Sequence, residues 1–348
     1  MNPYFSDKLK ALSFFLIIIV LYIHSGFHDY PHEIQGMPFN HYLQEGISGM
    51  IGRCAVPLFY AISGFLFFLN TDKGIKSVYL KMKKRVRTLL VPFIIAALFF
   101  PVIVILMDFI PFAGQFMNNN SFTKNLDLPF FTIVKSLFYK VTNGTTPWAF
   151  HLWFLRDLIL TIILSPILYL TRKYVGGITL IILLFLLNFT QQDIVPAYAL
   201  FWFMCGSKFL DKISTLRTKW IPISFIILSI LELSFPSDKW QYTTIPIISL
   251  GVVSIWTVYD KTVSTKFKLE QNKPLFIACQ YTFFIYLFHE PTLNIIRKLL
   301  VCAIGKTSLG FAATYLLSPW IFVFFFVLLG IVLKRIIPKA YNLCTGGR

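Results

Sequence analysis

The stretch ALSFFLIIIVLYIHSG, residues 11–26, decides the fold that this sequence predicts. It is apolar over nearly the roughly 20 residues that a helix needs to cross about 30 Å of hydrocarbon. A basic segment precedes it and no small-residue cleavage site follows it, so we expect an uncleaved signal-anchor helix. The one ionisable residue in the stretch is His24, near its far end. Because an ionisable side chain in hydrocarbon is costly and is by default functional, His24 is the first candidate site residue.

Nine further apolar runs follow the first at loop-length spacing. Hydrophobic residues make up 56% of the chain and charged residues 14%, against about 25% charged residues in soluble domains. We therefore predict an all-α, polytopic integral membrane protein with about ten transmembrane helices, in a single domain over residues 1–348. The predicted spans are 11–27, 51–70, 89–110, 152–170, 176–190, 196–210, 219–235, 241–258, 274–294 and 308–333.

The distribution of basic residues predicts the orientation of the chain. Its net charge of +17 would suggest a nucleic-acid partner for a soluble protein. Here, however, 23 of the 32 Lys and Arg residues fall in alternate segments between the spans, which is the pattern of cytoplasmic loops. We therefore expect both termini in the cytoplasm, membrane lipids as neighbours, no nucleic acid, and His24 toward the outer side.

The depth of His24 leaves two interpretations open. Counting from Lys10 at the inner boundary, 14 residues at about 1.5 Å of rise place it roughly 21 Å across the membrane. It is either an interfacial histidine bonded to a neighbouring helix or a general base, because a neutral imidazole can take a proton from a hydroxyl. Polar residues of the next segment that could orient it are Asp29, His32, Glu33, His41 and Glu45.

A basic segment leads into the third predicted span. Such a cluster is typical of the cytoplasmic side of a membrane protein, where it also contacts anionic lipids. It equally suits the capture of phosphate groups, which acyl-coenzyme A carries. Pro92 lies shortly beyond and would free a helix carbonyl nearby. The basic residues are Lys81, Lys83, Lys84, Arg85 and Arg87.

Two further polar motifs lie at the outer ends of predicted spans. In His151-Leu-Trp-Phe-Leu-Arg-Asp157, Arg156 and Asp157 are expected to pair, and Trp153 is either an interfacial belt residue or a platform for a sugar ring. In Tyr281-Thr-Phe-Phe-Ile-Tyr-Leu-Phe-His-Glu-Pro291, His289 and Glu290 form either an interfacial pair or part of a polar site.

In these motifs the chain resembles the acyltransferase-3 family of bacterial integral-membrane O-acyltransferases. The matching segments occur in family order and span nearly the whole chain. One departure is Ser13, which stands where many members carry an arginine eleven residues before the histidine, with Lys10 nearby. In the basic segment either Arg85 with Thr88 or Lys84 with Arg87 matches the family's paired arginines. The segments are IIIVLYIH (17–24), VPLFYAISGFL (56–66), KRVRTLLVP (84–92), HLWFLRD (151–157) and IYLFH (285–289).

The resemblance implies a membrane enzyme of the bacterial cytoplasmic membrane. It would transfer an acyl group, usually acetyl from cytoplasmic acetyl-coenzyme A, to a hydroxyl of an envelope or exported glycan. His24 would be catalytic, and Lys84, Arg85 and Arg87 would assist acyl-coenzyme A binding. Because a thioester carbonyl is already electrophilic, no metal and no permanently bound cofactor is expected.

Other candidate residues follow from position. Arg53 at the outer end of the second span is a candidate for the oxyanion or for an acceptor phosphate, with a lipid-headgroup anchor as the alternative. Asp157 is a further catalytic candidate. The substrate-binding candidates are Trp153, Arg156, His289, Glu290 and Glu45.

A transporter or exporter of a glycan is the main alternative function. It would also need many spans and buried polar groups, but it predicts two similar halves with discontinuous helices. No internal repeat is visible in this sequence.

The predicted topology can be tested with reporter fusions. Fusions at residues 80 and 265 should report the cytoplasm, and fusions at residues 35 and 125 the outer side, because the basic segments lie on the inner side. A cytoplasmic signal at residue 35 or 125 would contradict the predicted position of His24.

Overall fold

In the computed structural model every regular element of the described chain is helical, which confirms the all-α prediction. The structure describes residues 3–27, 36–69, 71, 74–108, 110, 130–138, 149–188, 196–213, 216, 219–235, 244–263 and 268–347.

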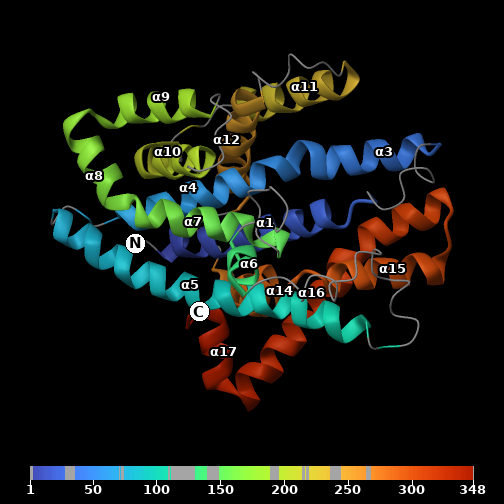
Figure 1. Cartoon of the computed structure of the whole chain (residues 1–348). Coiled ribbons are helices and arrows are strands. Elements are labelled where there is room, and N and C mark those ends of the chain that lie inside the picture. Colours follow the sequence, from blue (N-terminus) through green and yellow to red (C-terminus); the bar gives the residue numbers. More distant parts are fainter. Residues whose placement is uncertain are drawn as a thin grey trace.

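The helices follow one another through the chain with short connections (Figure 1). The first half contains α1 (Pro3–His24), α3 (Pro38–Gln44), η1 (Glu45–Ile51), η2 (Gly52–Cys54), α4 (Ala55–Phe68), α5 (Ile75–Asp108), α6 (Phe130–Ser136), η5 (Phe150–Leu152), α7 (Trp153–Ile163) and α8 (Ser165–Tyr174). The second half contains α9 (Gly177–Leu187), α10 (Ala197–Ile213), α11 (Trp220–Ser234), α12 (Thr244–Thr262), η7 (Leu269–Gln271), α13 (Lys273–Gln280), α14 (Thr282–Phe288), α15 (Thr292–Ile304), α16 (Ser308–Ile336) and α17 (Pro338–Thr345).

Membrane-spanning length is clear for only part of this set. Within the described residues, Pro38–Phe68 and Ser308–Ile336 are long and apolar enough to cross a bilayer. The pair Phe150–Ile163 and Ser165–Tyr174, bent by 54°, would make a third span, and α9 and α11 are shorter apolar helices. These helices support a membrane protein, and the count of ten spans stays a prediction.

Two of the predicted spans are interrupted at prolines. Span 152–170 divides into α7 and α8, with Pro166 in the first turn of α8. Span 274–294 divides into α13, α14 and the start of α15, which begins just after Pro291. Proline lacks the backbone N–H that would continue the helix ladder, so the chain changes direction at these points. The second interruption leaves His289 and Glu290 between two helices.

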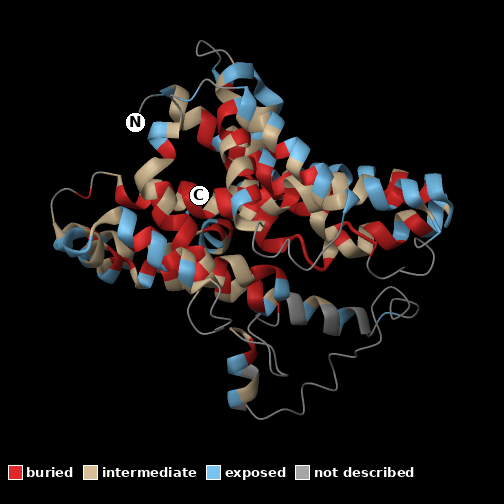
Figure 2. Ribbon diagram, turned by 90° about the horizontal axis from the view of Figure 1, so that it is seen from above, coloured by how far each residue is buried: buried red, intermediate tan, exposed pale blue. Residues whose placement is uncertain are grey.

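The outer faces of several helices are apolar and exposed. Figure 2 shows buried residues along the inside of the molecule and exposed ones toward its edges. Exposed apolar patches of this extent mark a surface that contacts lipid or another protein. Exposed apolar side chains on α9, α11 and α16 include Ile178, Ile182, Leu186, Ile226, Ile227, Ile230, Leu317, Phe324, Phe325 and Leu328.

Helix α1 is the central element of the fold. It packs against α4, α13, α14, α15 and α16, and Leu16, Ile17 and Leu21 are fully buried. At its first turns the buried Lys8 ammonium contacts Asp260 of α12 at 2.6 Å and lies 3.7 Å above the Trp256 ring. These contacts fix the start of α1, and its rigid length then places His24 at the other end.

Helices α4 and α10 pack with their backbones in direct contact. A methyl group built at Gly64 would overlap the carbonyl oxygen of Phe203, and one at Gly206 would overlap that of Ala61. Small residues at a helix crossing allow this close approach inside a membrane. The crossing fixes the position of α4.

Replacement of either glycine by alanine should push α4 and α10 apart. Gly64→Ala and Gly206→Ala are each expected to lower stability by about 1–3 kcal/mol, the usual effect of overpacking. The thermal midpoint of the purified protein in detergent measures this. Gly46→Ala is the matched control, because open space surrounds that glycine; an equal loss in all three variants would contradict the close packing.

Candidate functional site

Three histidines from distant parts of the chain meet at one end of the helical core. His24 ends α1, His151 lies in η5 and His289 follows α14. The ring centres of His24 and His289 are 4.8 Å apart, and those of His151 and His289 are also 4.8 Å apart. We call these three residues the histidine cluster.

Backbone carbonyls fix two rings of the cluster. His289 Nδ1 lies 2.7 Å from the carbonyl oxygen of Tyr286, and His151 Nε2 lies 3.2 Å from that of Leu287. A carbonyl oxygen only accepts, so each of these nitrogens carries the proton and donates it. In the neutral ring His289 Nε2 then holds a lone pair, and this buried atom has no hydrogen-bond partner among the described residues. The cluster therefore presents a buried acceptor toward His24.

Glu290 is placed to orient His24. Its Oε1 lies 3.8 Å from His24 Nδ1, and the glutamate is 4% exposed, whereas the His24 side chain is 18% exposed. A carboxylate at Nδ1 favours the tautomer that leaves Nε2 as the basic nitrogen and stabilises the protonated ring. The Phe150 ring packs on His24 at 5.6 Å. This pair has the composition of a general base and its orienting acid.

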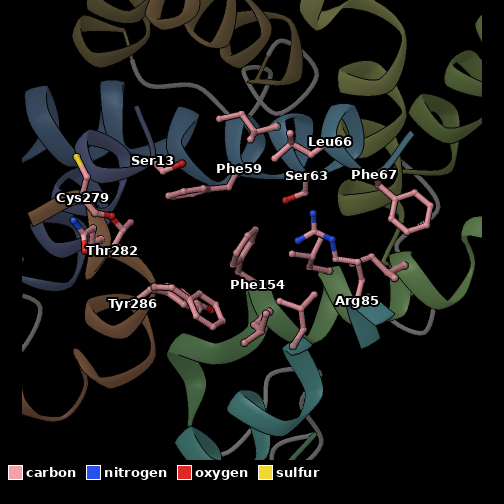
Figure 3. A pocket seen from close by; sticks show the side chains of 17 residues that line it. Ser13, Phe59, Ser63, Leu66, Phe67, Arg85, Phe154, Cys279, Thr282 and Tyr286 are labelled. Carbon is pink, nitrogen blue, oxygen red and sulfur yellow. The ribbon is translucent and has the colours of Figure 1, made fainter. Parts of the chain in front are cut away.

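A cavity of about 300 Å³ lies between α1, α4, α5, α7, α13 and α14 (Figure 3). Aromatic and aliphatic side chains form most of its wall. Its polar lining residues are Ser13, Ser63, Arg85, Gln280 and Thr282. Figure 3 shows the Arg85 guanidinium directed toward Ser63, with Phe154 and Tyr286 at the other side. The cavity therefore has one cation in a largely apolar wall.

The cavity and the histidine cluster share a wall. Tyr286 lines the cavity, its hydroxyl donates to the carbonyl oxygen of His151 at 3.2 Å, and its own carbonyl accepts from His289. Phe154, which also lines the cavity, lies one helical turn after His151. A molecule in the cavity would thus end beside the cluster.

The structure separates the basic residues that lead into the third predicted span. Arg85 is half-buried and lines the cavity, whereas Lys84 and Arg87 are exposed. Lys81 donates to the carbonyl oxygens of Phe67 and Leu69 at the end of α4. Arg85 is therefore the member of the segment that reaches the cavity.

The position at which many family members carry arginine also faces this cavity. Ser13 lines it, so a small hydroxyl stands there. Lys10, the nearby basic residue, is 49% exposed and lies 3.8 Å from the Asp7 carboxylate. It does not line the cavity.

The other predicted residues lie in separate contacts. Arg53 forms an ion pair with Glu232 of α11. Arg156 and Asp157 pair at 2.7 Å, and Arg156 also donates to the carbonyl oxygen of Phe138.

Two of the remaining candidates are half-buried. Trp153 begins α7, and Glu45 begins η1 with its carboxylate beside Gly49. His41 is exposed on α3, and Asp29, His32 and Glu33 lie outside the described residues. Within the described part, no group of three or more His, Cys, Asp or Glu residues has an arrangement suited to a metal ion.

Sequence reasoning thus found His24, His289 and Glu290, which the fold brings together. It noted His151 only as the first residue of a motif and gave no role to Ser63, Phe154 or Tyr286. The signal for His151 was its position at the outer entry of a span, the same depth predicted for His24. Nothing in the sequence pattern of α4 or α14 distinguishes a residue that lines the cavity from one in the core.

Comparison with known proteins gives two matches. A family model described as an acyltransferase domain, acyltransferase-3, matches residues 4–337. The succinoglycan biosynthesis protein ExoH of Rhizobium meliloti (strain 1021) is 25% identical over 374 residues, covering all of this chain and 94% of that protein. No solved structure matches the chain. The family match includes the histidine cluster and every residue of the cavity wall.

Proposed function

We propose a reaction for this chain on the premise that it belongs to the acyltransferase-3 family and is an acyltransferase. We propose that it moves an acyl group, acetyl in the simplest case, from cytoplasmic acyl-coenzyme A to a hydroxyl of an envelope or exported glycan. We place it as a multi-pass protein of the bacterial cytoplasmic membrane. The observation that carries the proposal is the His24–Glu290 pair behind the wall of a cavity that contains Arg85.

The shape of the cavity suits the arm of the donor. Its volume of about 300 Å³ is at the lower end of ligand pockets, so it would hold a narrow arm and not a whole nucleotide. Hydroxyl and amide groups at Ser13, Ser63 and Gln280 suit the amides of a pantetheine chain, and Arg85 suits a phosphate. The nucleotide would remain outside, near the exposed Lys84 and Arg87.

The chemistry needs a base at the acceptor hydroxyl. His24 Nε2 would take the hydroxyl proton as the oxygen attacks the thioester carbonyl, and Glu290 would stabilise the imidazolium. The carbon–sulfur bond then breaks and the proton passes to the thiolate, giving the ester and free coenzyme A. No metal or resident cofactor enters this reaction.

The acceptor side is proposed from weaker observations. The name of the ExoH relative refers to the biosynthesis of succinoglycan, which supports a glycan as the acceptor here. Trp153, Glu45 and Arg53 are our candidates for acceptor contacts. The ion pair between Arg53 and Glu232 would have to open for such a contact. For Arg156 and Asp157, we propose that the pair holds α7 in place below the cluster.

The base is tested with His24→Gln, which keeps hydrogen bonding but does not titrate near neutral pH. Acyl transfer in membranes should fall by about 10²–10⁴-fold, the usual contribution of a general base. Glu290→Gln should lower the same rate with donor binding unchanged. Glu270→Gln is the matched control, since Glu270 is exposed on η7. Near-normal turnover of His24→Gln would exclude His24 as the base.

Arg85 is tested by donor binding to the purified protein. Arg85→Ala should weaken acyl-coenzyme A binding by about tenfold or more, because a charge-assisted contact in a partly buried site is lost. Arg87→Ala should have a small effect that disappears at high salt, since its exposed charge is screened. Equal effects of the two substitutions, or none from Arg85→Ala, would return the segment to topology signalling.

A further inference from the structure

The wall between the cavity and the histidine cluster depends on one aromatic side chain. Phe154 stands between Phe59 and Tyr286 in Figure 3. Its ring centre lies 5.7 Å from that of Phe59, 5.6 Å from that of Tyr286 and 4.7 Å from that of Tyr60. Three neighbouring rings therefore fix the position of the Phe154 ring.

The backbone at Phe154 is also fixed. The hydroxyl of the fully buried Tyr60 donates to the Phe154 carbonyl oxygen at 3.3 Å. Three residues earlier, His151 donates to the Leu287 carbonyl oxygen, and Phe150 packs on His24. The short segment from Phe150 to Phe154 thus contacts the catalytic candidate at one end and the cavity at the other.

This placement limits the space for an acyl group. Under the proposed function the thioester carbonyl has to reach the cluster, so the acyl chain beyond it would lie against this aromatic wall. Phe154 is half-buried because part of its ring faces the cavity, whereas Tyr60 behind it is fully buried. A smaller side chain at 154 would extend the cavity without removing any hydroxyl or charge from its lining.

We propose that Phe154 determines the length of the acyl group that the site accepts, by closing the donor cavity one helical turn from His151. The inference rests on the proposed function, because it assigns the cavity to the acyl end of the donor. It makes the native donor a short-chain acyl thioester. A poorly fitting methylene is expected to change selectivity by about 10–200-fold.

The test compares donors of different length on the full-length protein in detergent. Transfer rates are measured with acetyl-, butyryl- and octanoyl-coenzyme A, and binding with the unreactive S-ethyl and S-octyl thioethers of coenzyme A. In Phe154→Ala the octanoyl-to-acetyl ratio of kcat/KM, and the octyl-to-ethyl affinity ratio, should both rise at least tenfold. Phe154→Leu should give a smaller rise in the same direction, with less risk to folding.

Phe283→Ala is the matched control, since Phe283 lines the same cavity one turn of α14 before Tyr286. Its length ratios should remain those of the wild type. An equal rise in this control, or unchanged ratios in both Phe154 variants, would overturn the inference.

The binding experiment separates this inference from the proposed reaction. If the wild type binds the thioethers and Phe154→Ala shifts their ratio while no acyl-coenzyme A supports transfer, the proposed reaction fails and the inference stands. If the wild type transfers acyl groups with unchanged ratios in the variants, only the inference fails. If the wild type binds neither thioether, both fail.

Discussion

The contact between the Glu290 carboxylate and the His24 imidazole is the interaction on which the rest of the site depends. Both groups are ionisable and lie among helices whose surroundings disfavour charge, so each needs the other. The contact also joins the end of α1 to the junction between α14 and α15. A fold that separates these two junctions would leave two buried polar groups without compensation.

Several features of the fold maintain this contact. The pair of Lys8 and Asp260 anchors the first turns of α1, and the glycine crossing of α4 and α10 sets the position of the helix that carries Ser63. The carbonyls of Tyr286 and Leu287 orient the neighbouring histidines. Catalytic groups need this kind of second layer, because small displacements of a base greatly reduce its rate.

The sequence predicted the parts of this protein that follow from local chemistry. Apolar runs indicated helices, charge indicated orientation, and isolated polar residues such as His24, His289 and Glu290 indicated the site. It could not predict the breaks of predicted spans into shorter helices, because an apolar run looks continuous until a proline redirects it. Nor could it show that Arg85 faces inward while Lys84 and Arg87 face outward, since the rotation of α5 is set by packing against α7, α14 and α17.

The separation of Arg85 from the histidine cluster by a single closed wall has an electrical consequence for the proposed reaction. Coenzyme A and its phosphates stay on the inner side, so they never enter the membrane field. The acyl group moves outward in place of the hydroxyl hydrogen, and that hydrogen finally resides on the coenzyme A thiol on the inner side. This exchange carries no net charge, whereas each unbalanced elementary charge would couple to the membrane potential by about 2.3 kcal/mol per 100 mV. The thioester alone thus drives the outward delivery of the acyl group, with no ion gradient required.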